Sequence, residues 1–146
     1  MKIAMILILS FGVLQTSIWN TDLKVAEKEA SENNKMILLN FSGSDWCGPC
    51  IKLRTEVFES NVFQCFSRKW LVLVNADFPR LKKNRLEKEQ TAKNESLAET
   101  YNPQGHFPLT LLLNKNGKIV KTWEGFPDGT PGEFVSEIKK YIDSAN

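Results

Sequence analysis

Short apolar runs alternate with amphipathic or polar segments along the chain, and the two patterns predict different elements. Apolar runs too short for helices indicate buried strands, and they occupy residues 36–41, 70–77, 109–113 and 118–123. Longer segments with helical spacing or a polar face predict helices over residues 21–33, 50–58, 60–66, 80–101 and from 130 onward. Because helices separate the first strands, we expect these strands to pair in parallel.

Local signals support this order of elements. Asn116-Gly117, between the last two strands, is typical of a hairpin because both residues tolerate positive φ. Thr130 and Glu133 form a capping box around Pro131, which predicts the start of the last helix. The chain is therefore predicted to be α/β, a three-layer α/β/α sandwich around a central mixed sheet with an antiparallel edge.

Residues 1–17 have the pattern of a secretory signal peptide. Lys2 gives a positive start, residues 3–14 are mostly apolar, and small polar residues follow. The apolar run is shorter than the ~20 residues of a spanning helix. We expect a signal peptide over residues 1–17, its cleavage position open, and one exported domain over 18–146, periplasmic or secreted. The alternatives are a buried N-terminal element or an uncleaved membrane anchor through residues 3–14.

Composition and charge narrow the class of protein. The chain has 146 residues, of which 42% are hydrophobic and 25% charged, as in one globular domain. A net charge of +2, from 19 basic and 17 acidic residues, gives no reason to expect nucleic acid as the main partner. Three cysteines are too few for a disulfide scaffold, so the spacing of two of them matters more than their number.

The segment Trp46–Cys50 holds two cysteines where a predicted strand gives way to a helix. The unpaired N–H groups and partial positive charge at a helix start should stabilise a thiolate at Cys47 and lower its pKa. Cys50 is close enough along the chain to displace a partner from a mixed disulfide, and Gly48 and Pro49 keep the turn tight. This arrangement predicts a redox-active dithiol.

Other interpretations of the pair are a structural disulfide, half of a zinc site, or coincidence. A zinc site needs about four nitrogen or sulfur ligands, and beyond the pair the chain offers Cys65 and His106. A structural disulfide across so short a loop would add little stability, since stabilisation grows with loop length. We therefore favour redox chemistry and predict no metal.

The segment Asn40–Cys50 resembles the active-site segment of the thioredoxin family. The resemblance continues through the family's third helix, cis-proline loop and terminal hairpin, in that order, at residues 97–101, 105–108 and 109–118. The match spans residues 21–143, nearly the whole predicted domain. The signal-like start and the expanded segment before the proline are similar to exported bacterial thioredoxin-like proteins, including the C-terminal domain of the membrane thiol-disulfide transporter.

The resemblance implies a role for each matched residue. Cys47 would be the exposed nucleophile, and Cys50 would be the buried thiol that resolves the mixed disulfide. Trp46 would shape the surface beside them. Pro108 would be cis and would face the two sulfurs, and the backbone of Phe107 would pair with an extended substrate segment.

The implied activity is thiol–disulfide oxidoreduction, in the direction of reducing disulfides of exported proteins, because Gly-Pro between the cysteines resembles the reducing members. The implied partners are disulfide-containing protein substrates and a membrane thiol–disulfide electron donor. No small-molecule cofactor is expected, and the chain is expected to be a monomer. The alternatives are a disulfide isomerase or oxidase, and a binding module of the same fold without turnover.

One position departs from the family's pattern. Family members commonly place a buried Asp, the proton acceptor for the resolving cysteine, where this chain has Asn40. The lysine that often partners that Asp would fall near Leu73. Because Asn cannot take up a proton at neutral pH, our hypothesis is slower resolution at Cys50, unless Asp45 or Glu124 serves as acceptor through water.

Three further features have two interpretations each. His106 is predicted to face solvent, with an approach to Cys47 as the alternative. Cys65 is predicted to be a buried small hydrophobe, with a regulatory or intermolecular thiol as the alternative. Residues 80–93 contain six basic and two acidic residues and are predicted to be a solvated helix face, with a docking surface for an acidic partner as the alternative.

Overall fold

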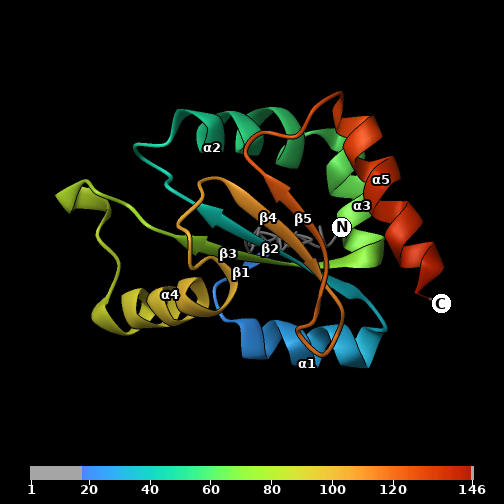
Figure 1. The fold of residues 1–146 in the computed structure, drawn as a ribbon, viewed down its shortest axis with the longest axis horizontal. Coiled ribbons are helices and arrows are strands. Elements are labelled where there is room, and N and C mark those ends of the chain that lie inside the picture. Colours follow the sequence, from blue (N-terminus) through green and yellow to red (C-terminus); the bar gives the residue numbers. More distant parts are fainter. Residues whose placement is uncertain (1–17, 146) are drawn as a thin grey trace, which may run out of the picture.

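A five-stranded sheet forms the centre of the computed structural model, which describes residues 18–145 (Figure 1). The strands are β1 (Trp19–Asn20), β2 (Met36–Ser42), β3 (Leu71–Asp77), β4 (Leu109–Leu113) and β5 (Ile119–Glu124). They lie in the order β1-β3-β2-β4-β5. β2 pairs with β3 in parallel and with β4 antiparallel, so the prediction of a mixed sheet with an antiparallel edge is confirmed.

Helices cover both faces of this sheet. They are α1 (Leu23–Asn33), α2 (Gly48–Lys52), the π-helical η1 (Leu53–Phe58), α3 (Asn61–Trp70), the short 3₁₀ turn η2 (Lys82–Asn84), α4 (Lys88–Tyr101) and α5 (Pro131–Ser144). Figure 1 shows α1 and α4 on one face, and α2, α3 and α5 on the other. The predicted three-layer α/β/α sandwich is therefore confirmed.

The central strands are buried on both faces because successive side chains enter two separate apolar clusters. In β2, Leu38 packs with η1, α3 and α5, whereas Ile37 and Leu39 pack with α1. Every residue of β2 is buried. Burial on both faces explains why this segment is a continuous apolar run rather than an alternating one.

The predicted helix over residues 80–101 is wrong in its first part. α4 begins only at Lys88, and the segment before it is irregular apart from η2. Asp45 accepts hydrogen bonds from the backbone N–H groups of Arg80 and Leu81, and these contacts hold the segment against the loop that precedes α2. The carboxylate of Asp45, distant in sequence, therefore accepts hydrogen bonds from N–H groups that the local sequence pattern assigned to a helix.

Three other elements differ from the predictions. α3 extends to Trp70, four residues past its predicted end, so β3 begins at Leu71 and not at residue 70. β1 was not predicted, because a strand of two residues has no periodicity to detect; it pairs with Leu73 and Val74 at the edge of the sheet. The helix predicted over residues 50–58 begins earlier, at Gly48, and becomes π-helical from Leu53.

The predicted start and turn signals lie where the sequence placed them. Ser60 accepts a hydrogen bond from the N–H of Phe63 and caps α3. Thr130 and Glu133 make both hydrogen bonds of a capping box at the start of α5. Gly117, with φ of 76°, closes the β4–β5 hairpin. These confirmed signals are all local in sequence.

The predicted signal peptide, residues 1–17, lies outside the described residues. Over residues 18–145, none of the helices is both long enough and apolar enough to cross a membrane. The boundary between an exported leader and the domain stays a prediction.

Cys65 is exposed on α3, so the prediction of a buried thiol is wrong. Phe63 and Ser67 are the buried residues of this helix. They are four residues apart and share one face, and position 65 lies roughly 200° around the helix from Phe63, on the outer side. The apolar residues around Cys65 in the sequence do not all face the core.

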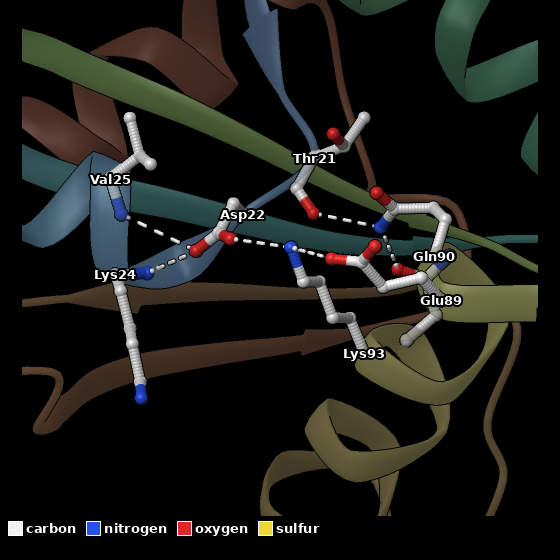
Figure 2. A network of polar contacts seen from close by, with 8 residues as sticks. Thr21, Asp22, Lys24, Val25, Glu89, Gln90 and Lys93 are labelled. Carbon is white, nitrogen blue, oxygen red and sulfur yellow. Dashed lines mark hydrogen bonds and ion pairs between the residues drawn. The ribbon is translucent and has the colours of Figure 1, made fainter.

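The start of α1 is joined to α4 by a network of polar contacts (Figure 2). Asp22 is the N-cap of α1 and accepts hydrogen bonds from the N–H groups of Lys24 and Val25. The second oxygen of Asp22 lies 3.1 Å from Nζ of Lys93 on α4. Gln90 donates to the carbonyl of Thr21 at 2.9 Å. Because Lys93 donates a hydrogen bond to Asp22, and the helix N–H groups do so as well, the pKa of Asp22 is lowered.

Replacing Asp22 with Asn should weaken this connection in a pH-dependent way. Asn keeps the helix cap but loses the charge that faces Lys93. Because the pKa of Asp22 is depressed on folding, its contribution is present above its ordinary pKa of 3.8 and is lost as pH falls through the lower folded value. We expect Asp22→Asn to lower Tm by about 1–2 °C at neutral pH and to have a smaller effect under acid conditions.

Thermal unfolding measured from neutral pH down to about pH 3 would check this. Asp128→Asn is the matched control, because Asp128 makes no ion pair with any residue between 18 and 145. A decrease in the Tm of Asp22→Asn that does not depend on pH, or an equal decrease in the Tm of the control, would contradict the assigned contact.

Exposure of Cys65 predicts rapid alkylation of the folded protein. Iodoacetamide added to the oxidised protein should modify one site, because Cys47 and Cys50 are joined in a disulfide. Peptide mass mapping would locate the label, and Cys65→Ser should remove it. Labelling that requires denaturant would restore the prediction of a buried thiol.

Candidate active site

Cys47 and Cys50 form a disulfide at the start of α2, with their Cα atoms 5.2 Å apart. Cys47 is the N-cap of the helix, and its Sγ accepts a hydrogen bond from the backbone N–H of Cys50 at 3.2 Å. Pro49 lies in the first turn, where the N–H that it lacks would have no intrahelical partner. Gly48 and Pro49 are both exposed. A sulfur therefore lies at a helix start, as the sequence predicted.

The two cysteines are about equally covered in this disulfide form. Cys47 is 5% exposed and Cys50 is 4% exposed. The expected contrast between an exposed Cys47 and a buried Cys50 is therefore wrong for the oxidised protein. In the preceding loop, the N–H of Cys47 donates to the carbonyl of Gly43 at 2.9 Å.

Trp46 lies beside the disulfide and is fixed from several directions. Its indole Nε1 donates to the carbonyl of Phe78 at 2.7 Å. Its ring meets the ring of Phe107 edge-on, with centroids 5.5 Å apart, and the guanidinium of Arg80 lies 3.6 Å from the centre of the Trp46 ring. Gly43 is required below it, because a Cβ there would overlap the indole. The predicted support residue is thus part of a rigid aromatic surface.

The Phe107–Pro108 peptide bond is cis, as predicted. Phe107 also packs edge-on against Phe78, with ring centroids 5.5 Å apart. Pro108 is buried, and its carbonyl accepts from the N–H of Gly125 after β5. Trp46, Phe78 and Phe107 therefore connect the loop before α2, the end of β3 and the cis-proline loop in one aromatic cluster.

Asp45 anchors the segment after β3 to the loop before α2. Its carboxylate accepts hydrogen bonds from the N–H of Arg80 at 2.9 Å, from the N–H of Leu81 at 3.0 Å and from the side chain of Asn84 at 3.0 Å. The backbone N–H of Arg80, followed by the side chain of Asn84, lowers the pKa of Asp45. Asp45 therefore has a structural task and is a poor proton acceptor for the dithiol.

Asp77, the last residue of β3, fixes the same loop from the other side. It accepts from the backbone N–H of Ser44 at 2.9 Å and from the Ser44 hydroxyl at 2.5 Å. The N–H of Phe78 in turn donates to the carbonyl of Ser42 at 2.8 Å. The loop that carries Trp46 and Cys47 is thus bound to the end of β3 through both side chains and backbone.

His106 pairs with Glu124 rather than with a cysteine. Its Nδ1 lies 3.2 Å from a carboxylate oxygen of Glu124 on β5, and its side chain is 38% exposed. The backbone of His106 is held by Asn102, whose side chain both donates to and accepts from it. His106 was predicted to face solvent, and its partly exposed side chain agrees with this, but the prediction did not include its contact with Glu124.

Asn40 is buried in a neutral polar network on the face of the sheet that α2, α3 and α5 cover. It is 5% exposed. Its side chain donates to Oδ1 of Asn75 at 2.9 Å and accepts from the hydroxyl of Thr110 at 3.1 Å. Leu73 is also buried on this face. All three members of the network are uncharged, so the network offers no group that titrates near neutral pH.

Sequence reasoning missed the residues that surround the cysteines from other parts of the chain. Phe78, Arg80 and Asn75 were not predicted to belong to the site, and Asp45 was considered only as a proton acceptor. Their contacts depend on which strand ends lie side by side, a long-range property with no local signal. Asn75 alone could have been suggested, by its place in an otherwise apolar strand.

The comparisons with known proteins agree with this geometry. The family described as the thioredoxin-like domain matches residues 23–142. The chain is 35% identical over 117 residues to a protein named disulfide bond reductase DsbH from Chlamydia pneumoniae, covering 80% of this chain and 68% of that protein. It is 46% identical over 127 residues to the thioredoxin-related protein DsbJ of the same organism. That match covers 87% of this chain but only 36% of DsbJ.

Solved structures show the same fold. A structure titled DsbH oxidoreductase superposes with a TM-score of 0.76 at 30% identity, over 90% of this chain and 93% of that one. The oxidised C-terminal domain of DsbD from Neisseria meningitidis gives a TM-score of 0.57 at 16% identity, over 82% and 92% of the two chains, which is a likeness of fold alone. The matched region, the Cys47–Cys50 disulfide and the cis proline agree: this chain belongs to the thioredoxin-like domain family and has the cysteine pair of a thiol-disulfide oxidoreductase.

Proposed function

We propose that this protein reduces disulfide bonds in other proteins, with Cys47 as nucleophile and Cys50 as resolving thiol. The observation that carries the proposal is the Cys47–Cys50 pair itself, with Cys47 Sγ at the N-cap of α2 and within hydrogen-bond reach of the Cys50 N–H. A helix start favours the thiolate, which is the attacking species. The relative named as a disulfide bond reductase supports the direction of electron flow.

The proposed reaction moves two electrons and two protons from the dithiol to the partner. The Cys47 thiolate attacks one partner sulfur, which breaks the partner's disulfide, forms a mixed disulfide and releases a thiolate that takes up a proton. The Cys50 thiolate then attacks Cys47 Sγ, which breaks the mixed disulfide and releases the second partner thiolate for protonation. The Cys47–Cys50 disulfide described above is the oxidised product of this cycle.

The neighbouring residues would position the partner without taking part in the chemistry. Trp46 and Phe107 form a fixed apolar surface beside the sulfurs, and Gly48 and Pro49 leave the outer side of the turn open. An extended partner segment would pair with the backbone of Phe107 next to Pro108. No metal or small-molecule cofactor has a part in this cycle.

The oxidised product must be reduced again before another turnover. Export of the domain spanning residues 18–146 would place it where disulfides form and persist, so the proposed second partner is a membrane thiol–disulfide donor. Residues 1–17 would supply the address for export, and the protein would act there as a monomer on disulfide-containing protein substrates.

Insulin reduction with dithiothreitol as the electron source tests the activity. The wild-type protein should accelerate the precipitation of reduced insulin chains, and Cys47→Ser should fall to the rate of dithiothreitol alone because no nucleophile remains. Cys50→Ser should accumulate a mixed disulfide at Cys47, since nothing resolves it.

Cys65→Ser is the matched control, because it removes the third thiol without touching the pair, and it should keep wild-type activity. Wild-type activity in Cys47→Ser would contradict the assigned nucleophile. A wild-type protein that binds partners but shows no turnover would instead support the alternative of a binding module.

Because the network around Asn40 is neutral, we predict that adding a titratable group there by a single substitution will change the pH dependence of the reaction rate. Asn40→Asp would introduce a carboxyl group of nearly the same shape into a buried site, where burial raises a carboxyl pKa. We expect the second, Cys50-dependent step to accelerate by several-fold above the pKa of the new group, and a new ionisation to appear in the pH–rate profile. Single-turnover kinetics from about pH 5 to 9 would measure both.

Thr110→Val is the control for this substitution. It disturbs the same hydrogen-bond network by removing the hydroxyl that donates to Asn40, but it adds no titratable group. It should leave the shape of the pH profile unchanged. An unchanged profile in Asn40→Asp would mean that removal of the proton from the Cys50 thiol does not depend on this site.

A further inference from the structure

We propose that the segment between β3 and α4 is a basic docking edge that selects partners with acidic residues near the disulfide to be reduced. The basic edge consists of Arg80, Lys82, Lys83 and Arg85. The inference deepens the proposed reductase function and rests on it, since it names the chemistry of the substrate for the same dithiol.

The basic edge is attached directly to the residues that flank Cys47. Asp45 holds the N–H groups of Arg80 and Leu81, and Trp46 holds the guanidinium of Arg80 against its ring. In Figure 1 this segment extends from the end of the sheet where β2 and β3 finish and α2 begins. A partner whose disulfide reaches Cys47 therefore passes close to these cations.

The four cations are accessible to a partner, and one of them, Arg80, also lies against the Trp46 ring. All of them are exposed, and none makes an ion pair with another residue between 18 and 145. The one carboxylate that contacts the segment, Asp45, faces its backbone N–H groups and not its charged side chains. Four positive charges within six residues consequently have no internal counterpart among the described residues.

The segment also has an apolar residue exposed among its charges. Leu81 is 48% exposed and is one of the few large hydrophobic side chains at the surface. An exposed apolar side chain adds buried apolar area to a contact, and the charges around it set the orientation of the partner. A peptide segment with carboxylates around an apolar residue would complement Leu81 and the neighbouring lysines.

The loop between β5 and α5 does not repeat this unpaired charge. The loop contains Asp128 and no cation of its own, and Lys52 of α2, which lies over the Phe126 ring in this loop, is paired with Glu56. Of these two surfaces only the basic edge presents unpaired positive charge, which orients an approaching partner as well as attracting it. Attraction of this kind raises association rates by about 10-fold or more at low salt and is screened at high salt.

The test uses three synthetic peptides, each with the same internal disulfide and with Glu, Gln or Lys at the flanking positions. The pre-reduced full-length protein is mixed with each peptide, and the single-turnover second-order rate constant is measured by acid quench and chromatography. We expect the Glu peptide to react about tenfold faster than the Gln peptide at about 0.02 M NaCl, and the Lys peptide to be slowest. At about 0.5 M NaCl the three rates should converge.

Two double variants separate the basic edge from the overall charge of the protein. Lys82→Gln with Lys83→Gln removes two charges from the edge. Lys115→Gln with Lys118→Gln removes two exposed lysines, which make no ion pair with residues 18–145, from the β4–β5 hairpin at the opposite end of the sheet. The first pair should reduce the preference for the Glu peptide about threefold or more, and the second should leave it nearly unchanged. Lys115→Gln with Lys118→Gln should also react with the Gln peptide as the wild type does.

The outcomes distinguish this inference from the function on which it rests. Equal rates for the three peptides, or equal effects of the two double variants, would overturn the acidic partner while leaving reduction itself intact. A second result would also overturn the proposal. If the three peptides react at equal rates, and the protein binds phosphatidylglycerol vesicles through Lys82 and Lys83, so that Lys82→Gln with Lys83→Gln abolishes this binding, the cations are assigned to a lipid surface. Failure to reduce any peptide would overturn the reductase function and this inference with it.

Discussion

The parallel pairing of β2 with β3 is the constraint on which the site depends. Its register runs as far as Ser42 opposite Asp77, so the loops that follow the two strands leave the sheet at the same edge. Each loop then supplies a carboxylate for the N–H groups of the other, Asp77 for Ser44 and Asp45 for Arg80. Without this register, the segment that contains the cysteines would lose its hydrogen bonds to the end of β3 and the segment after it, and the start of α2 would not be held in position.

The same edge separates two kinds of polar environment. At the surface beyond the ends of β2 and β3, backbone N–H groups donate to the carboxylates of Asp45 and Asp77, and water screens the charges of these carboxylates. Beneath α2, the network of Asn40, Asn75 and Thr110 satisfies buried polar atoms without any charge. A neutral network avoids the cost of burying a carboxylate, but it offers no acid–base partner to Cys50, the thiol that we propose resolves the mixed disulfide. Under that proposed role, stability of the core and speed of proton transfer are in opposition at this position.

The sequence predicted the features that depend on neighbours along the chain. The buried strands, the Thr130–Glu133 capping box, the hairpin at Gly117 and the cysteine pair at a helix start are all local, and the structure confirms them. The cis peptide bond at Pro108 came from family resemblance. The sequence did not predict the aromatic contacts of Phe78 or the anchoring by Asp45, because both arise only when strand ends meet in space. It also misplaced Cys65, since an apolar neighbourhood in sequence does not fix the angle around a helix.

The irregular segment before α4 shows how local sequence and long-range contacts act together. Its polar composition resembles a helix, but Pro79 restricts the backbone of Phe78, and only a single 3₁₀ turn forms, in which the N–H of Arg85 donates to the carbonyl of Lys82. Asp45 stabilises this irregular course by accepting two N–H groups that would otherwise begin a helix. The segment therefore presents exposed cations next to the loop that contains Trp46. A proline and a carboxylate distant in sequence together determine the shape of this segment and the surface at which we propose that partners dock.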